Sequence, residues 1–471
     1  MKQNKIKKTK RGISLIVLII TIIVVIILAA AVILTISRDG GIINKARYAK
    51  DEYNKIEYKD RINEAYTIVK NKQEMQGKTA REIFEEVKKS LNFEKAKYEI
   101  SEKSMNITTK EGYEYTLTGD GNIYDEKVAI LDIAEGNIDL YSTGYKQYTG
   151  NLQNLNKNDA TTYTGKYIIT GTTTENVVRV CDEGKYDITI KDLNMNMSDK
   201  TPMVCNAKSI ANNVFVYITL EGDNYLTTQN GPALSFNIGY NEEEAVVNRS
   251  TIIFNGNGHL TIKLNGNYQL GSALGSSYGG SGIYSKCKAN FIINSGTFDI
   301  SSGHCGDALG AGLRGSGFNI TINGGDIIAR GGEYSYGIGS NGNLIINGGR
   351  IETTRSYNKD SISGEDIKIT GGTIKVGGNK GFVKTPTDGD NTLCKTSIKL
   401  QGLEKDKQVT KLTTSDNIEY GIKDMYTLEG GMLYMYLPLG KREITIKVDG
   451  KTFKGEVETK EEENVTVLNQ I

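Results

Sequence analysis

The middle of the chain repeats a short apolar segment that ends in turn-forming residues. In the last four of these segments, Asn or Thr comes next and a glycine turn follows. A second small apolar group lies 17 residues downstream of four segments, counted from Tyr217, Ile292, Thr321 and Ile345. The repeated segments are Ile188–Ile190, Val216–Ile218, Leu260–Ile262, Phe291–Ile293, Ile320–Ile322, Leu344–Ile346 and Ile367–Ile369.

A repeat of roughly 23 to 31 residues with β-type segments and glycine turns is typical of a solenoid. Leucine-rich repeats are excluded because their L-x-x-L-x-L-x-x-N pattern is missing, and a βαβ sheet is excluded because no helical segment separates the strands. We therefore predict a mainly β protein in which residues 128–396 form a right-handed parallel β-helix. The side chains predicted to face its core include Ile292, Leu309, Ile320, Ile322, Ile338, Ile345 and Ile369.

The composition supports an ordered repeat and excludes some functions. The chain has 54 Gly but only 4 Pro among 471 residues, which favours tight turns over a disordered tail. A net charge of +1 gives no electrostatic basis for nucleic-acid binding. The five cysteines show no C-x-x-C spacing, so neither a disulfide framework nor a structural zinc site is expected.

Residues 13–36 are apolar except for Ser14, Thr21 and Thr35, and none of them is charged. This length can cross the hydrocarbon core of a bilayer as a helix, and it exceeds the apolar region of a cleaved signal peptide. The segment before it, residues 1–12, is basic and has no acidic residue, which predicts a cytoplasmic N-terminus. The rest of the chain is then expected outside the membrane of a bacterial cell.

The sequence Lys10-Arg11-Gly12-Ile13 at the start of this run resembles a type IV prepilin leader. The resemblance implies that a prepilin peptidase cleaves between Gly12 and Ile13 and that other pilin-like subunits are potential partners. Val17 occupies the position that is usually Glu in this family. A membrane-anchored pilin-like protein therefore fits as well as a pilus subunit.

The regions on either side of the predicted β-helix have different patterns. Residues 37–127 show helical spacing up to Val69, a capping box at Thr79 and Glu82, and strands at 98–107, 113–117 and 122–130, which predicts a pilin-like helical stalk with a small β element. Residues 397–471 alternate between apolar and polar positions, which predicts a small antiparallel β domain that closes the end of the solenoid. Its expected strands are 397–400, 409–412, 420–422, 432–437, 443–448 and 453–457.

Few residues in the repeat suggest catalysis. The G-x-G-x-x-G match at 310–315 is not followed by a helical pattern, so we interpret it as solenoid corners. A glycosidase or a calcium-dependent lyase would need convergent carboxylates, the lyase with a nearby base, for which Arg314, Arg330 and Arg350 are candidates. Asp307 and Asp360 each lie two residues before an apolar group, so they are candidate calcium ligands on one face. Solvated turn residues are the alternative for both.

Tyrosines in or beside the glycine-rich turns provide a different type of site. A tyrosine ring can stack on the C–H face of a sugar while its hydroxyl group forms a hydrogen bond. Surface packing is the alternative role for each of them. The tyrosines proposed for carbohydrate binding are Tyr278, Tyr284, Tyr334, Tyr336 and Tyr357.

The units Phe318–Gly325 and Asp366–Gly372, with the groups Ala308–Gly310 and Gly337–Gly339, resemble bacterial β-helical proteins classed as carbohydrate-binding. The resemblance implies a non-catalytic binder of cell-wall or plant polysaccharide, with calcium bound in some relatives and no cofactor required. The sequence-based hypothesis is thus a cell-surface, pilin-like adhesin that binds an extracellular polysaccharide. A polysaccharide lyase or hydrolase and a structural stalk without a ligand are the alternatives.

Overall fold

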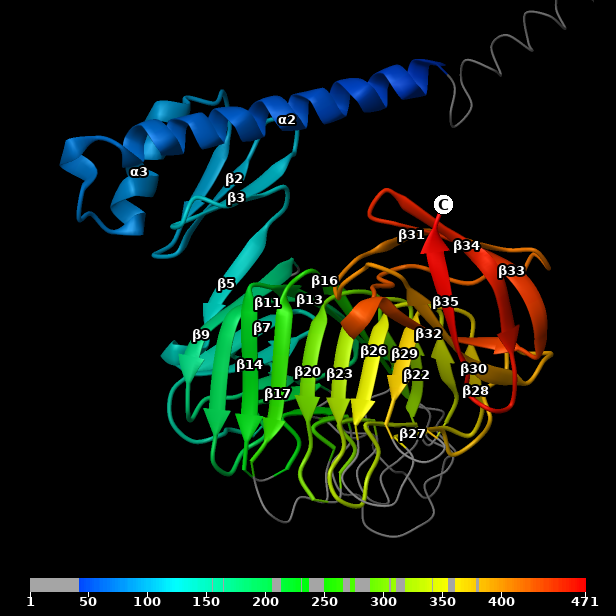
Figure 1. The fold of residues 1–471 in the computed structure, drawn as a ribbon. Helices are drawn as coiled ribbons and strands as arrows, with labels where there is room; N and C mark the ends of the chain where they lie inside the picture. The colour runs from blue at the N-terminus through cyan, green and yellow to red at the C-terminus, as the bar shows by residue number, and fades with distance from the viewer. Residues whose placement is uncertain are drawn as a thin grey trace, which may run out of the picture. The chain divides into compact units, whose positions relative to one another are not determined.

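The structure is a computed structural model that describes residues 42–154, 156–163, 165–205, 213–229, 231–236, 250–265, 272–275, 289–304, 306–310, 318–340, 342–354, 361–377 and 381–471. The chain divides into two compact units, residues 1–127 and 128–471 (Figure 1). None of the described helices is long and apolar enough to span a membrane. The predicted leader, the cleavage site Gly12–Ile13 and the span 13–36 lie outside the described residues.

The first unit contains two helices and a small antiparallel sheet. One face of the long helix is buried with Phe84 and Val87 of the second helix and with Met105 and Tyr115 of the sheet. The predicted capping box is present: the Thr79 side chain accepts a hydrogen bond from the Glu82 amide, and the Glu82 side chain accepts one from the Thr79 amide. The elements are α2 (Ile42–Lys70), η1 (Gln73–Met75), α3 (Ala80–Leu91), β1 (Lys97–Ile100), β2 (Ser104–Thr108), β3 (Glu114–Thr118) and β4 (Ile123–Tyr124).

Two of the strands predicted for this region are each divided into two separate strands in the structure. The predicted strand 98–107 is a hairpin, because the chain reverses between β1 and β2, which pair antiparallel. The predicted strand 122–130 is also divided, since β4 ends at Tyr124 and the next strand, β5 (Val128–Asp132), belongs to the second unit. The short segments 101–103 and 125–127, which separate these strands, contain no Gly or Pro, so the sequence pattern did not indicate that a strand ends there.

The second unit begins with strands that precede the regular repeat. Strands β6 and β7 form an antiparallel hairpin, and β9 pairs in parallel with both β5 and β11 (Gly184–Met197). These opening elements are β5, η2 (Ile133–Glu135), β6 (Asn137–Tyr141), β7 (Gly144–Tyr148), β8 (Thr161–Thr162), β9 (Lys166–Thr173) and β10 (Val178–Val180).

The repeat region, residues 184–377, is built from three rows of parallel strands. In each row a strand pairs with its equivalent in the next repeat, and β11 starts two rows because its first part pairs with β13 and its second part with β14. The first row is β11 (Gly184–Met197), β13 (Val214–Glu221), β16 (Thr251–Gly256), β19 (Ala289–Ile293), β22 (Phe318–Ile322), β25 (Leu344–Ile346) and β28 (Ile367–Ile369).

The second row, whose strands are labelled in Figure 1, and the third row follow the same order along the repeat. The second row is β14 (Asp223–Thr228), β17 (His259–Leu264), β20 (Thr297–Ser301), β23 (Asp326–Arg330), β26 (Arg350–Thr354) and β29 (Thr373–Val376). The third row is β12 (Met203–Cys205), β15 (Leu234–Phe236), β18 (Leu274–Gly275), β21 (Leu309–Gly310), β24 (Ile338–Gly339) and β27 (Ile362–Ser363). The prediction of a mainly β protein with large parallel sheets is confirmed.

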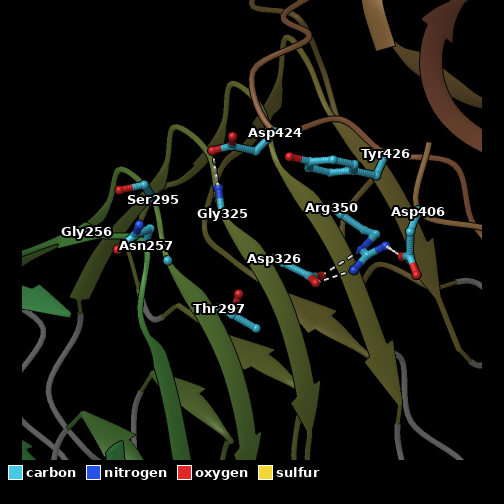
Figure 2. Close-up of a pocket in the computed structure, with 11 residues that line it drawn as sticks. Gly256, Asn257, Ser295, Thr297, Gly325, Asp326, Arg350, Asp406, Asp424 and Tyr426 are labelled. Carbon is cyan, nitrogen blue, oxygen red and sulfur yellow. Dashed lines mark hydrogen bonds and ion pairs between the residues drawn. The ribbon is translucent and has the colours of Figure 1, made fainter. Parts of the chain in front are cut away.

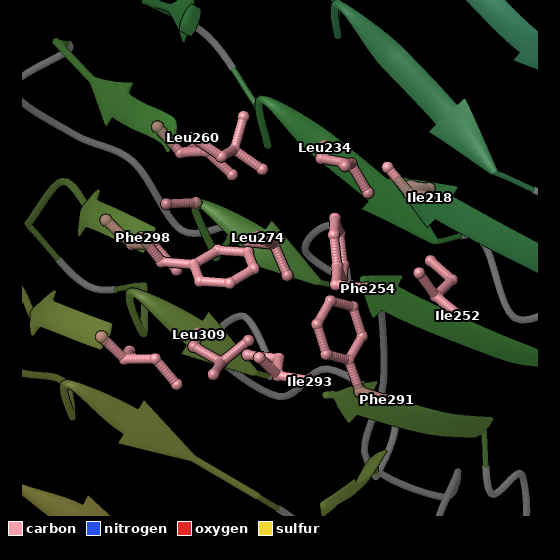
Figure 3. Packing of buried hydrophobic residues seen from close by; sticks show 14 of the residues in the cluster. Ile218, Leu234, Ile252, Phe254, Leu260, Leu274, Phe291, Ile293, Phe298 and Leu309 are labelled. Carbon is pink, nitrogen blue, oxygen red and sulfur yellow. The ribbon is translucent and has the colours of Figure 1, made fainter. Parts of the chain in front are cut away.

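The core lies between the rows and is filled with aliphatic and aromatic side chains. Phe254 contacts both Phe291 and Phe298, with ring centroids 5.4 Å apart in each pair (Figure 3). Ile322 is completely buried. Each such side chain contributes about 1.5–3 kcal/mol by leaving water, so the stacked core is the main source of stability in this region.

Two residues predicted to face the core point outward. Ile292 and Ile345 are only half-buried, while their neighbours Phe291, Ile293 and Leu344 are buried. Alternate side chains of a strand face opposite sides, so a run of three apolar residues does not reveal which one points outward. The other predicted core residues are fully or almost fully buried: Leu309, Ile320, Ile322, Ile338 and Ile369.

The C-terminal region forms a six-stranded sheet in which only β30 and β35 pair in parallel. Tyr436 and Leu393 from this sheet are buried in the core of the repeat region, where the Tyr436 ring packs edge-on against Phe382 at 5.1 Å. The elements are β30 (Leu393–Leu400), β31 (Val409–Thr414), η3 (Glu429–Gly431), β32 (Met432–Pro438), β33 (Gly440–Val448), β34 (Lys451–Thr459) and β35 (Val465–Gln470). The prediction of a strand at 420–422 is wrong, and β35 was not predicted.

Candidate functional site

A cavity of about 410 Å³ lies where the C-terminal region meets the corners between the first and second rows of the repeat (Figure 2). Its floor comes from successive repeats and its far wall from the C-terminal region. The lining residues are Gly256, Asn257, Ser295, Gly296, Thr297, Gly325, Asp326, Arg350, Asp406, Asp424 and Tyr426.

Glycine corners determine the shape of the floor. Gly256, Gly296, Gly325 and Gly349 occupy equivalent corners and all have φ between 95° and 105°, a conformation that L-residues with side chains rarely adopt. The first residue of the following strand is held in register, so that Thr297 pairs with Asp326, and Asp326 with Arg350. The repeat therefore places one polar side chain per strand along the floor.

A ladder of amide side chains runs beside these corners on the first row. Asn294 donates to Asn255 over 3.0 Å, Asn323 donates to Asn294 over 2.8 Å, and Asn347 donates to Asn323 over 2.8 Å. Thr370 ends the ladder by donating to Asn347. The ladder locks the corners of successive repeats together.

A short part of the C-terminal region, residues 418–426, crosses these corners, and we call it the crossing segment. The Lys423 carbonyl accepts a hydrogen bond from the Gly349 amide over 2.7 Å, and the Gly421 carbonyl accepts one from the Gly372 amide over 2.8 Å. A Cβ atom at Gly371 would lie 2.5 Å from the Gly421 carbonyl oxygen. The absence of side chains at the corners thus lets a second backbone approach the repeat.

Side chains strengthen this attachment. Asp424 accepts a hydrogen bond from the Gly325 amide over 2.9 Å, and the Lys423 ammonium group donates to the Asn294 carbonyl over 2.6 Å. The buried Tyr420 hydroxyl donates to the Gly372 carbonyl over 2.9 Å. The crossing segment is therefore fixed at several successive repeats, and it holds Asp424 and Tyr426 over the cavity.

Arg350 organises the charges of the cavity. Its guanidinium group donates to both carboxylate oxygens of Asp326 and to Asp406, and it lies 5.6 Å from the centre of the Tyr426 ring (Figure 2). The Arg350 side chain is only 13% exposed. Its hydrogen bond with Asp326 is the largest cause of its raised pKa, so Arg350 stays charged.

This arrangement can hold a polar ligand with ring faces. Tyr426 provides a half-buried aromatic ring, Arg350 keeps that ring and two carboxylates in place, and the carboxylates accept hydrogen bonds. Aromatic rings combined with fixed planar polar groups are suited to sugars, which have C–H faces and hydroxyl rims.

The tyrosines proposed from the sequence lie elsewhere or outside the described residues. Tyr334 is 52% exposed and packs edge-on against His304, whose Nδ1 is 2.9 Å from Glu333. Tyr336 is half-buried, and neither Tyr334 nor Tyr336 lines the cavity. Tyr278, Tyr284 and Tyr357 lie outside the described residues, so their roles stay predictions.

Only one of the two predicted calcium ligands, Asp307, lies among the described residues. Asp307 is 8% exposed and accepts a hydrogen bond from the Tyr336 amide over 2.9 Å, so this carboxylate joins its loop to the equivalent loop of the next repeat. Asp360 lies outside the described residues. Within the part of the chain that the structure describes, no three His, Cys, Asp or Glu side chains are placed to hold a metal ion. Calcium binding at these two residues stays a prediction.

Sequence reasoning missed half of the cavity. Arg350 was among the basic candidates, but it was not linked to Asp326. The register of the repeat could have linked them, because both directly follow a glycine corner. Asp406, Asp424 and Tyr426 gave no such signal, since they reach the cavity through the folding back of a region with no repeat.

The comparisons with known proteins give one match. A family model described as "carbohydrate-binding domain-containing protein" matches residues 156–276. These residues run from before β9 to just after β18, and they include the first repeats and Gly256 and Asn257 of the cavity. No curated protein and no solved structure matches the chain.

Proposed function

We propose that this protein binds an extracellular polysaccharide without cleaving it and that the cavity around Tyr426 and Arg350 is the binding site. The observation that carries the proposal is the match of residues 156–276 to the carbohydrate-binding family model. The repeat is proposed to be a right-handed parallel β-helix, which presents the cavity on a rigid framework.

The geometry of the cavity supports binding over catalysis. Both oxygens of Asp326 accept hydrogen bonds from Arg350, so neither is available to shuttle a proton. Tyr426 can stack on a sugar ring, while Asp406 and Asp424 can accept hydrogen bonds from hydroxyl groups. Ring stacking and hydrogen bonds to hydroxyl groups are the contacts by which a protein recognises a sugar.

The same proposal places the protein at the bacterial cell surface. The basic segment 1–12 and the apolar run 13–36 support a single membrane anchor with a cytoplasmic N-terminus. Cleavage by a prepilin peptidase would produce a new terminus at Ile13. Mass spectrometry of the protein purified from its own membranes tests this, and an intact Met1 terminus in cells with an active peptidase would contradict the pilin-like part of the proposal.

A glycan array probed with the purified full chain tests the binding function. We expect binding to one class of polysaccharide and no release of reducing ends or unsaturated uronides from it. Product release from any polysaccharide would support the lyase or hydrolase alternative. An array without a single binder would support a structural stalk.

A further inference from the structure

The charges that line the cavity are unbalanced. Three carboxylates, those of Asp326, Asp406 and Asp424, face one guanidinium group, that of Arg350, and the other lining residues are uncharged. Lys423 lies beside the cavity without lining it, and its ammonium group donates to the Asn294 carbonyl. The lining thus carries a net negative charge.

The one cation of the lining is already engaged. Nε and one terminal nitrogen of Arg350 donate to Asp326, and the other terminal nitrogen donates to Asp406. With its side chain 13% exposed, Arg350 cannot turn toward a ligand without leaving these partners. The lining carboxylates would therefore repel a carboxylate or sulfate group on a ligand, and the one lining cation is not free to bind it.

Two carboxylate oxygens remain available to a ligand. Asp406 uses one oxygen for Arg350, and Asp424 uses one for the Gly325 amide. Among the described residues, the second oxygen of each has no hydrogen-bonding partner. The Asp406 side chain is 61% exposed, and both residues border the cavity near Tyr426 (Figure 2). These oxygens accept hydrogen bonds and attract positive charge.

We propose that the cavity selects polysaccharides that carry free amino groups over neutral ones, and neutral ones over acidic ones. This inference rests on the proposed function and names the ligand class of the same site. Tyr426 provides the stacking contact that all three classes share, and Asp406 and Asp424 favour a protonated amine. A protonated amine at either carboxylate gains a charge-assisted hydrogen bond that a hydroxyl or acetamido group does not provide.

Titration of the full chain with three oligosaccharides of equal length tests the proposal. The probes are a glucosamine oligomer, its N-acetylated counterpart and a galacturonate oligomer. We expect the affinity to fall in that order, with the preference for the amine reduced at high salt. Equal affinity for the first two, or tighter binding of the galacturonate oligomer, would overturn the inference while leaving carbohydrate binding in place. If none of the three binds and the glycan array is also empty, the proposed function itself fails.

Two isosteric variants localise the effect. Asp406→Asn and Asp424→Asn should each lower the affinity for the glucosamine oligomer by about two- to fivefold, as expected for partly exposed ion pairs. Glu456→Gln removes a charge from the same C-terminal sheet outside the cavity and should leave the affinity unchanged. If all three variants weaken binding equally, overall charge and not the cavity selects the ligand, and the inference is wrong. If Asp406→Asn and Asp424→Asn leave binding unchanged in a folded protein, the inference is also wrong.

Discussion

The repeat region and the crossing segment contribute to the same cavity in opposite ways. From β16 onward, successive repeats share the strand register, a glycine at the corner and buried apolar side chains, so each strand is specified by its neighbours. The crossing segment has no repeat, and it is held by contacts to glycine corners far away in the sequence. Regular structure therefore supplies the framework together with Asp326 and Arg350, and the crossing segment adds Asp424 and Tyr426.

The largest effect is expected from a change in the core of the repeat. Ile322→Ala should lower the free energy of unfolding by about 2–5 kcal/mol, because it opens a cavity among stacked side chains. Ile345→Ala, at an outward position of the next strand, should cost much less. Chemical denaturation measures both, and equal losses would show that the assignment of inward and outward faces is wrong.

A smaller loss of stability is expected where the crossing segment joins the repeat. Tyr420→Phe removes the hydroxyl that donates to the Gly372 carbonyl and accepts from the Tyr436 amide, both in buried surroundings. Leaving these groups unpaired should cost about 1–3 kcal/mol. Tyr434→Phe in the same sheet is the matched control, and an equal loss in both variants would show that the crossing segment is not held through this hydroxyl.

The third change affects binding more than folding. Tyr426→Ala removes the aromatic ring of the cavity and should weaken polysaccharide binding by about five- to tenfold, as expected for the loss of one stacking contact. Its thermal unfolding should stay close to that of the parent protein. Retention on an insoluble polysaccharide column measures the effect, with Tyr434→Ala as a control from the same region. A column profile that is identical for parent and Tyr426→Ala would place the binding site elsewhere.

The smallest effect concerns pH. Partial burial is the largest single influence on the pKa of Asp416 and raises it. The hydrogen bonds from Arg442 and Thr414 and the positive charge of Arg442 together outweigh burial and leave the pKa below its ordinary value of 3.8. A carboxyl group with a lowered pKa contributes stability above its unfolded pKa and loses it as the pH falls through the folded value. The parent should therefore be more stable than Asp416→Asn at pH 6, by less than about 1 kcal/mol because Asp416 is 40% exposed. The difference should shrink below pH 4, and a difference that persists at pH 2 would contradict this explanation.

The two regions also differ in how well the sequence predicted them. The constant distance of 17 residues marks positions that pair in register, since Ile292, Thr321 and Ile345 are aligned in the first row and Leu309, Ile338 and Ile362 in the third. Because the repeats can be compared with one another, such positions can be identified from this sequence alone. The outward position was misassigned at Ile292 and Ile345, although Thr321, the polar residue in register with both, marks it.

The site was predicted less well because it depends on contacts between distant parts of the chain. Asp326 and Arg350 are one repeat apart, so the register alone pairs them. Tyr426 and Asp424 are placed by hydrogen bonds to Gly349 and Gly325, which no local pattern encodes. A single sequence therefore predicts only the cavity residues that belong to the repeat, and not those that come from the irregular region.

A crystal structure of the full chain with its best-binding oligosaccharide tests the central claim most directly. The account predicts a sugar ring in contact with Tyr426, at about 4 Å, with its polar groups facing Asp406 and Asp424. An oligosaccharide bound elsewhere, for example at the exposed Tyr334 beside His304, with the cavity around Arg350 empty, would contradict the proposed site.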